Sequence, residues 1–155
     1  MRILAVAVCS LLAAAPVLSA QAAATSTDTS LHWGPAPAAF PKGATMAVLK
    51  GDPSKAEPFT VELALPRGYV IPPHFHPTDE TVTVQQGTLL VGMGDVFDPA
   101  KTKTMKVGAS STIPAQAHHF AATSGASVIM VSAMGPFAMT YVNPADDPQT
   151  HAAKP

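Results

Sequence analysis

The sequence has one cysteine, Cys9, which lies in an apolar stretch close to the start of the chain. The rest of the chain therefore cannot form an internal disulfide, and it offers no thiolate as a nucleophile or as a metal ligand. Its stability must come from a packed core. Any metal site in it must use nitrogen and oxygen ligands.

Charge is also scarce, because Asp, Glu, Lys and Arg make up 12% of the 155 residues and the formal net charge is -1. No basic cluster of the kind that binds nucleic acid is present, so we expect no nucleic-acid partner. Helical periodicity is missing too, whereas 16 prolines and 10 glycines are spread along the chain. This composition favours short strands joined by turns within one domain.

The first residues have the features of a signal peptide. Arg2 precedes an apolar run, Ile3–Leu18, and small residues then offer cleavage sites after Ala22 or after Ala24. An uncleaved membrane anchor is the alternative, but the run is short for a bilayer crossing. We predict a bacterial export signal over residues 1–24 and a periplasmic or secreted mature protein that is not attached to a membrane.

Three segments follow the predicted signal peptide. Residues 25–44 contain several prolines, and we expect an extended arm that Trp33 and Phe40 fix to the core or to a second subunit, which makes a homodimer possible. Residues 45–142 contain about eight short stretches with strand patterns, as in a sandwich or barrel. Residues 143–155 are polar and are predicted to form a flexible tail.

The clearest strand signal is Phe59–Leu65, in which apolar and polar residues alternate. This alternation places Phe59, Val61 and Leu63 on the face that packs against the core. A second predicted strand, which runs from Tyr69 to His76, contains two consecutive prolines. We therefore expect it to be an edge strand or a bulged strand.

Two histidines and a glutamate carry the strongest signal for chemistry. His74 and His76 are two residues apart, so a strand places both imidazoles on one face. Glu80 follows a short turn and begins the next predicted strand, where its carboxylate can return to the same point. Imidazole nitrogen and carboxylate oxygen are the usual ligands of divalent first-row metals.

A fourth ligand has to come from elsewhere in the chain. The candidates are the remaining histidines, namely His32, His118, His119 and His151. His118 and His119 are adjacent, so on a strand they face opposite sides and only one of them can enter a pocket. Adjacency alone does not decide which one.

The spacing around these residues resembles the first motif of the cupins. The matching pattern is Gly68-x5-His74-x-His76-x3-Glu80-x6-Gly87. A later stretch is similar to the second cupin motif, with the pattern Gly108-x5-Pro114-x-Gln116-x2-His119-x3-Thr123. The second stretch departs from the family at two positions, where Gln116 replaces a glycine and Thr123 replaces an asparagine. The glutamine puts a side chain where the family has a tight turn.

The cupin resemblance covers roughly residues 45–142 and implies an all-β, RmlC-like jelly-roll barrel, also described as a double-stranded β-helix. It implies that the metal ligands are His74, His76, Glu80 and His119, so the choice of His119 over His118 comes from the resemblance. The implied cofactor is one divalent transition metal: Fe, Mn, Ni, Co, Cu or Zn.

Two kinds of function agree with such a site. A divalent metal held by three histidines and one glutamate keeps a net charge of about +1 and open positions for a small molecule. The resemblance implies a small-molecule metalloenzyme of the dioxygenase, decarboxylase or isomerase class. The alternative is a non-catalytic periplasmic module that binds a small ligand or a metal. The sequence names no catalytic residue, and we expect Tyr69 and Tyr141 to pack rather than transfer protons.

Overall fold

The computed structural model describes residues 31–151. The predicted signal peptide, the beginning of the predicted arm and the last four residues of the predicted tail lie outside the described part. Within the described part, no helix is both long enough and apolar enough to cross a membrane.

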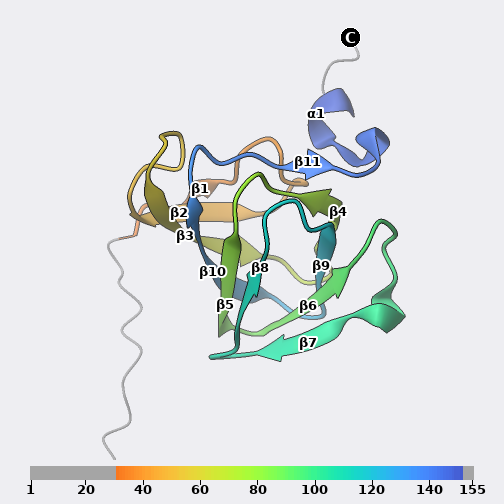
Figure 1. Cartoon of the computed structure of the whole chain (residues 1–155). Helices are drawn as coiled ribbons and strands as arrows, with labels where there is room; N and C mark the ends of the chain where they lie inside the picture. Colours follow the sequence, from red (N-terminus) through yellow and green to blue (C-terminus); the bar gives the residue numbers. More distant parts are fainter. Residues whose placement is uncertain (1–30, 152–155) are drawn as a thin grey trace, which may run out of the picture.

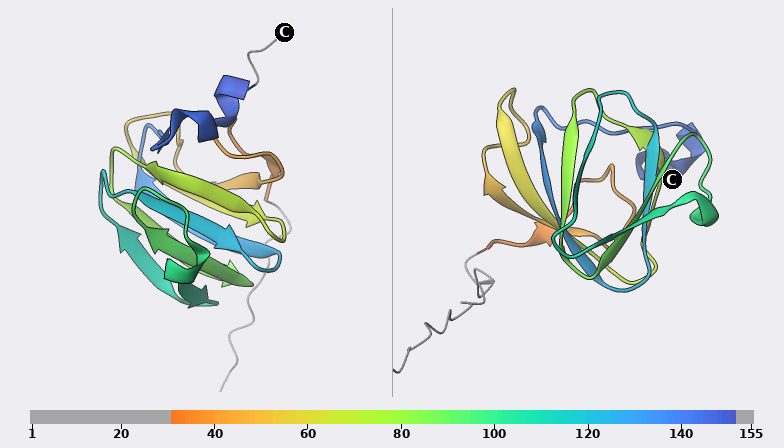
Figure 2. Two further views of the ribbon diagram at one scale, coloured as in Figure 1. Left: turned by 90° about the vertical axis from the view of Figure 1, so that its right-hand side faces the viewer. Right: turned by 60° about the horizontal axis from the view of Figure 1, so that its bottom comes forward.

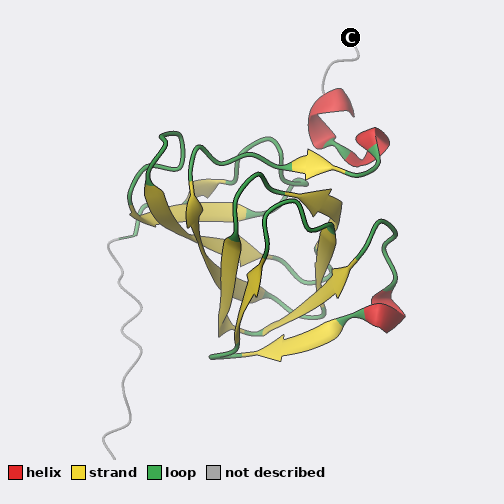
Figure 3. Cartoon of the chain, viewed as in Figure 1, coloured by secondary structure: helices red, strands yellow, loops and turns green. Residues whose placement is uncertain are grey.

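Almost all regular structure in the described chain is β-strand, as Figure 3 shows. The strands are β1 (Gly34–Pro35), β2 (Thr45–Lys50), β3 (Pro58–Leu65), β4 (Val70–Phe75), β5 (Glu80–Gln86), β6 (Thr88–Met93), β7 (Lys103–Lys106), β8 (Ser110–Ile113), β9 (His119–Thr123), β10 (Ser127–Met134) and β11 (Thr140–Tyr141). The prediction of an all-β fold is confirmed.

The strands form two antiparallel sheets. The six-stranded sheet has the order β1-β2-β3-β10-β5-β8, and the five-stranded sheet has the order β11-β4-β9-β6-β7. Consecutive strands of the chain often lie in different sheets, so the chain crosses repeatedly between them (Figure 1). The two sheets curve toward each other, as the two further views show (Figure 2). This arrangement agrees with a jelly roll.

The alternation predicted for Phe59–Leu65 is present in β3. Phe59, Val61 and Leu63 are each 3% exposed, whereas Thr60 and Glu62 between them are partly exposed. The inward faces of β5 and β10 continue this apolar layer. The core therefore lies between the two sheets, and residues on the inner faces at one end of it can line a pocket.

The arm is fixed to the barrel by Phe40 rather than by Trp33. Phe40 is buried and its ring stacks on that of Phe137, with the ring centroids 5.6 Å apart. Two tyrosine hydroxyls donate hydrogen bonds to arm carbonyls, from Tyr69 to Pro41 and from Tyr141 to Ala39. The expectation that the tyrosines pack agrees with their burial.

Trp33 is 42% exposed, so the expected anchoring of the arm to the core through this side chain is not seen. It precedes β1, which is only two residues long and forms the edge of the six-stranded sheet. A short edge strand offers little neighbouring surface, and a large side chain just before it stays open to solvent.

Helical structure in the described chain is limited to three short segments (Figure 3). Residues Pro99–Lys101 form a 3-10 helix between β6 and β7. Residues Pro144–Asp146 and Pro148–His151 form a second 3-10 helix and the one-turn helix α1. The latter two occupy part of the segment predicted as a flexible tail. Asn143 accepts a hydrogen bond from the backbone of Ala145, a local turn that polarity alone does not reveal.

Candidate metal centre

Three histidines from two neighbouring strands meet inside the barrel. His74 lies in β4, His76 directly follows this strand, and His119 begins β9. His74 and His119 are register partners in the β4–β9 pair. One ligand nitrogen from each of the three imidazoles can be chosen so that all lie within 4.8 Å of one another. All three residues are buried, with exposed fractions between 3% and 7%.

A bulge in β4 sets the direction of the first histidines. The register of the β4–β9 pair shifts between Ile71 and His74, across Pro72 and Pro73. Proline lacks a backbone N–H, so these two positions cannot donate hydrogen bonds to β9. The predicted bulge is therefore observed, although β4 lies between β11 and β9 and is not an edge strand.

Backbone carbonyls fix the orientation of all three imidazole rings. The Nδ1 atom of His74 lies 2.7 Å from the carbonyl oxygen of Pro72, and that of His76 lies 2.7 Å from the oxygen of Ala138. The Nδ1 atom of His119 lies 3.0 Å from the oxygen of Ala117. A carbonyl only accepts, so each Nδ1 carries the hydrogen and each neutral ring presents the lone pair of Nε2.

Burial keeps His74 neutral. Removal from water, together with the neighbouring imidazole of His119, lowers the pKa of His74 to about 3. The Nε2 atom of His76 is buried and has no hydrogen-bond partner in the described chain. Buried polar atoms without partners are costly, so converging nitrogen lone pairs fit a bound cation. The residues present therefore suit a divalent metal.

Glu80 closes the group from the opposite sheet. It begins β5, and one carboxylate oxygen lies 3.5 Å from Nε2 of His76 and 3.4 Å from Nε2 of His119. Burial alone raises the pKa of Glu80, but its contact with His119 and the nearby imidazoles of His76 and His74 together lower it below its ordinary value. A metal cation at the same place would favour the carboxylate in the same way.

The two adjacent histidines have different surroundings. His119 points into the barrel, whereas the side chain of His118 is 37% exposed. The Nδ1 atom of His118 lies 2.6 Å from a carboxylate oxygen of Asp95, and its ring stacks on Phe75. Of the other candidates, His32 is exposed in the arm, and His151 is the last residue of α1.

The loop before His119 carries Gln116, one of the two departures from the motif. Gln116 has a φ of 63°, the left-handed conformation that glycine adopts without strain. Its backbone N–H donates to the carbonyl oxygen of His76 at 2.9 Å. The neighbouring N–H of Ala115 donates to the carboxylate of Asp79 at 2.8 Å. The loop therefore connects the segments that carry His76 and His119, and Asp79 is exposed and bonded to this loop.

Thr123, the other departure, stabilises a turn on the far side of β9. Its buried hydroxyl donates to the carbonyl oxygen of Pro66 at 2.6 Å and accepts from the N–H of Tyr69 at 3.0 Å. The residue lies in the same strand as His119 but four positions further along. These contacts place Thr123 in the turn and not among the grouped histidines.

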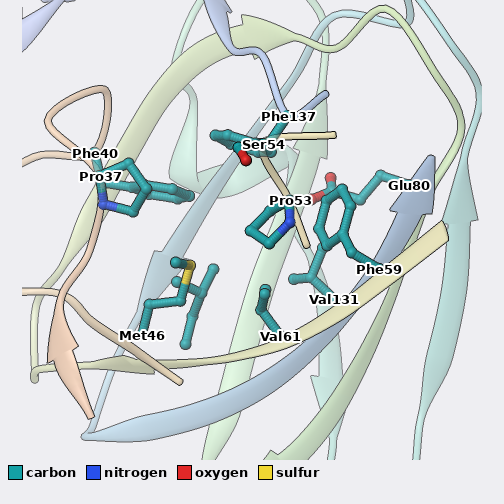
Figure 4. Close-up of a pocket in the computed structure, with 11 residues that line it drawn as sticks. Pro37, Phe40, Met46, Pro53, Ser54, Phe59, Val61, Glu80, Val131 and Phe137 are labelled. Atoms are coloured by element: carbon teal, nitrogen blue, oxygen red, sulfur yellow. The ribbon is translucent and has the colours of Figure 1, made fainter. Parts of the chain in front are cut away.

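An apolar cavity of about 240 Å³ adjoins Glu80 (Figure 4). Its walls come from the inner faces of β2, β3 and β10, from the arm and from two loops, and include Phe40, Met46, Phe59, Val61 and Phe137. The ring of Phe137 also lies next to His76, with the centroids 5.6 Å apart. The cavity therefore reaches the group of proposed ligands at Glu80, whereas the three histidines lie behind its wall and do not line it.

Sequence reasoning missed these walls and the three carbonyl partners. Met46, in β2, lines the cavity, and its place there was not predicted from the sequence. Two of the carbonyl contacts follow a local rule, because His74 and His119 each contact the residue two positions earlier. The contact from His76 to Ala138 spans 62 positions and has no local signal.

The comparisons with known proteins agree with this geometry. Residues 61–134 match the family described as "Cupin domain". This region is similar to a cupin domain. It includes His74, His76, Glu80 and His119, and the arm and the last strand lie outside it. No curated protein sequence matches the chain.

Solved structures show the same fold at low sequence identity. A polyketide cyclase from Streptomyces resistomycificus is 22% identical, with a TM-score of 0.58 over 74% of this chain and 81% of that chain. A cupin superfamily protein from Desulfitobacterium hafniense is 12% identical, with a TM-score of 0.51 over 60% and 78%. An oxalate oxidase is 22% identical, with a TM-score of 0.52 over 68% and 58%. At these identities the likeness concerns the fold alone.

Proposed function

We propose that this protein is a divalent-metal cupin that acts on a small molecule, with His74, His76, Glu80 and His119 as the metal ligands. The ligand set is three neutral imidazoles and one carboxylate, which suits Fe, Mn, Ni, Co, Cu or Zn. When bound, such a metal acts as a Lewis acid toward a small molecule at its open positions. Reactions of the dioxygenase, decarboxylase or isomerase class fit this chemistry.

The observation that carries the proposal is the orientation of the three imidazoles. Each Nδ1 is used by a backbone carbonyl, the three imidazoles are grouped, and the Nε2 atoms of His76 and His119 face Glu80. Without a cation, buried lone pairs would face each other with little compensation. With a cation, all of them are satisfied at once, which is the usual arrangement of metal-binding histidines.

Metal titration of paired variants tests this assignment. We expect one divalent ion to bind per chain in the wild type, and His119→Ala to lose tight binding because it removes an inward-facing ligand. His118→Ala, the matched control, should bind as the wild type does, since its side chain is outside the site. The measurement is the cobalt(II) absorption spectrum together with elemental analysis.

The titration also tests Glu80 separately. Glu80→Gln keeps the size of the side chain but removes the charge, so we expect metal affinity to fall about 10- to 100-fold. Equal binding by wild type and His119→Ala would overturn the ligand assignment. Metal binding without turnover of any chelating small molecule would instead favour the alternative, a non-catalytic module that binds a small ligand or a metal.

A further inference from the structure

The cavity next to Glu80 has the size of a single ring with a few substituents. Its volume is about 240 Å³. A buried cavity of about 150 Å³ is known to accommodate benzene, whereas drug-sized ligands occupy about 300 Å³ or more. The cavity therefore accepts one ring and its attached groups, and it excludes fused polycyclic compounds.

The walls favour an aromatic ring. Phe40, Phe59 and Phe137 all contribute to the lining, and they represent half of the six phenylalanines in the sequence. The rings of Phe59 and Phe137 are perpendicular, with centroids 6.3 Å apart (Figure 4). Aromatic groups gain additional stabilisation from edge-to-face and offset contacts with such walls. A polyhydroxylated ligand such as a sugar would lose its hydrogen bonds to water there.

The charges around the cavity limit the ligand to one negative charge. Among the described residues that line it, Glu80 is the only charged one. A divalent metal, three neutral histidines and the Glu80 carboxylate sum to a charge of +1. One anionic oxygen neutralises this charge, and a second one would be left uncompensated in an apolar cavity, which is costly.

Lys55, which lies in a loop next to the cavity, is not available to compensate a second charge. Lys55 belongs to the loop that supplies Pro53 and Ser54 to the wall. Its ammonium pairs with the Asp52 carboxylate at 3.2 Å, and its side chain is 67% exposed. A cation that is already paired and hydrated adds little to binding at the bottom of the cavity.

We propose that the cavity binds one-ring aromatic compounds with a single anionic oxygen group, such as a carboxylate or phenolate, and that this group faces the metal. The inference rests on the proposed metal function and adds the class of ligand. It excludes dicarboxylates, which need a second cation. The ring lies against the phenylalanine walls, and the arm covers it through Phe40.

A ligand series on the zinc-loaded protein tests the proposal by calorimetry. Benzoate and 2-methylbenzoate should bind at least about tenfold more tightly than phthalate, because phthalate has nearly the size of 2-methylbenzoate but carries two negative charges. Benzylamine should not bind detectably, because the site is positive. Removal of zinc should abolish benzoate binding, because only the negative Glu80 then remains.

A charge-insertion variant provides the second test. Met46→Lys adds one cation to the cavity wall, so we expect the preference for 2-methylbenzoate over phthalate to shrink at least about tenfold. Met130→Lys adds the same charge on the outer face of β10, opposite Glu62, and should leave the preference unchanged. If Met46→Lys fails to fold, the ligand series on the wild-type protein alone tests the proposed ligand class.

The outcomes separate the two proposals. If zinc binds and phthalate matches or exceeds 2-methylbenzoate, the inferred ligand class is wrong and the metal function stands. If zinc binds and no aromatic monoanion does, the inference is again wrong. If the protein takes up no metal, the proposed function fails and the ligand inference fails with it.

Discussion

At the scale of single residues, Gln116 has a strained backbone conformation that lowers the stability of the fold. A residue with a side chain loses roughly 1 kcal/mol or more in the left-handed conformation that this loop requires. The position corresponds to a glycine in the second cupin motif, and the observed φ of 63° shows why glycine suits it. The side-chain amide recovers little, because it lies 3.4 Å from the carbonyl oxygen of His76.

We therefore expect Gln116→Gly to raise the free energy of unfolding by about 0.5–1 kcal/mol, since relief of strain exceeds the added entropy of the unfolded chain. Thermal or urea unfolding measures this. Gln116→Ala is the matched control, because it removes the amide and keeps the strained backbone, so it should be no more stable than the wild type. Equal stabilisation by glycine and alanine would show that backbone strain is not the cause.

The site residues show which contacts a sequence reveals. The spacing of His74, His76 and Glu80 predicts a shared location, and the structure brings them together with His119. Their role as metal ligands stays a prediction. Sequence spacing does not reveal the carbonyl of Ala138, because its approach to His76 depends on how β11 and the preceding loop pack against β4.

At the scale of elements, the arm is the part whose attachment matters most for the cavity. It contributes Pro37 and Phe40 to the wall. Its backbone is held by the hydroxyls of Tyr69 and Tyr141. The sequence predicted an extended arm from its prolines, but it could not distinguish Phe40 from Trp33 as the anchor. That distinction depends on Phe137, which lies 97 positions beyond Phe40 and stacks on it.

Removal of one tyrosine hydroxyl should loosen the arm. In Tyr141→Phe we expect a loss of about 1 kcal/mol in the free energy of unfolding and faster hydrogen exchange at the amide of Phe40, because the carbonyl of Ala39 loses its donor. Hydrogen exchange with mass spectrometry over the arm measures the change. Trp33→Phe changes an exposed side chain of the same arm and should leave exchange near Phe40 as it is. Unchanged exchange in Tyr141→Phe would show that stacking of Phe40 on Phe137 alone holds the arm.

The strands themselves were the easier elements to predict. β3 is a regular alternation, and its inward and outward residues follow from a period of two. The order of the strands within the sheets, β3 beside β10 and β4 beside β9, depends on contacts between distant segments. The resemblance to cupin motifs supplied that architecture, whereas composition indicated only a sandwich or a barrel.

At the scale of the whole molecule, the free energy of unfolding depends on the protonation of the buried site. The folded chain holds the pKa of His74 at about 3, compared with an ordinary value of 6.5. Between these pH values the unfolded chain binds more protons than the folded chain, so acidification favours unfolding. The pKa of Glu80 is also lowered in the folded chain, from an ordinary value of 4.5. Acidification below pH 4.5 therefore lowers the free energy of unfolding through Glu80 as well.

We expect the metal-free protein to lose stability as the pH falls from 6.5 toward 3, by up to about 1.4 kcal/mol per pH unit from His74 alone. Urea unfolding in the presence of a chelator measures this slope. His74→Asn removes the titrating group and should flatten the slope between pH 6.5 and 5. A slope that is the same in wild type and variant would mean that other groups dominate acid unfolding.

Export through the predicted signal peptide and the possible homodimer also concern the whole molecule, and both stay predictions. The exposed side chains of Trp33, Val48 and Leu49 belong to the same region of β1 and β2, where the six-stranded sheet ends. Sequence alone does not decide between a second subunit and solvent at this edge, because either environment is compatible with the same short strand.

The three hydrogen bonds that orient the imidazoles are made to the main chain. No single side-chain replacement at Pro72, Ala117 or Ala138 deletes an acceptor, because every amino acid supplies a carbonyl. The geometry of the site is therefore buffered against mutation, while the cavity walls consist of side chains that mutation can exchange one at a time. Because the main chain orients the imidazoles and side chains form the cavity walls, ligand preference can change in evolution while the orientation of the imidazoles is retained.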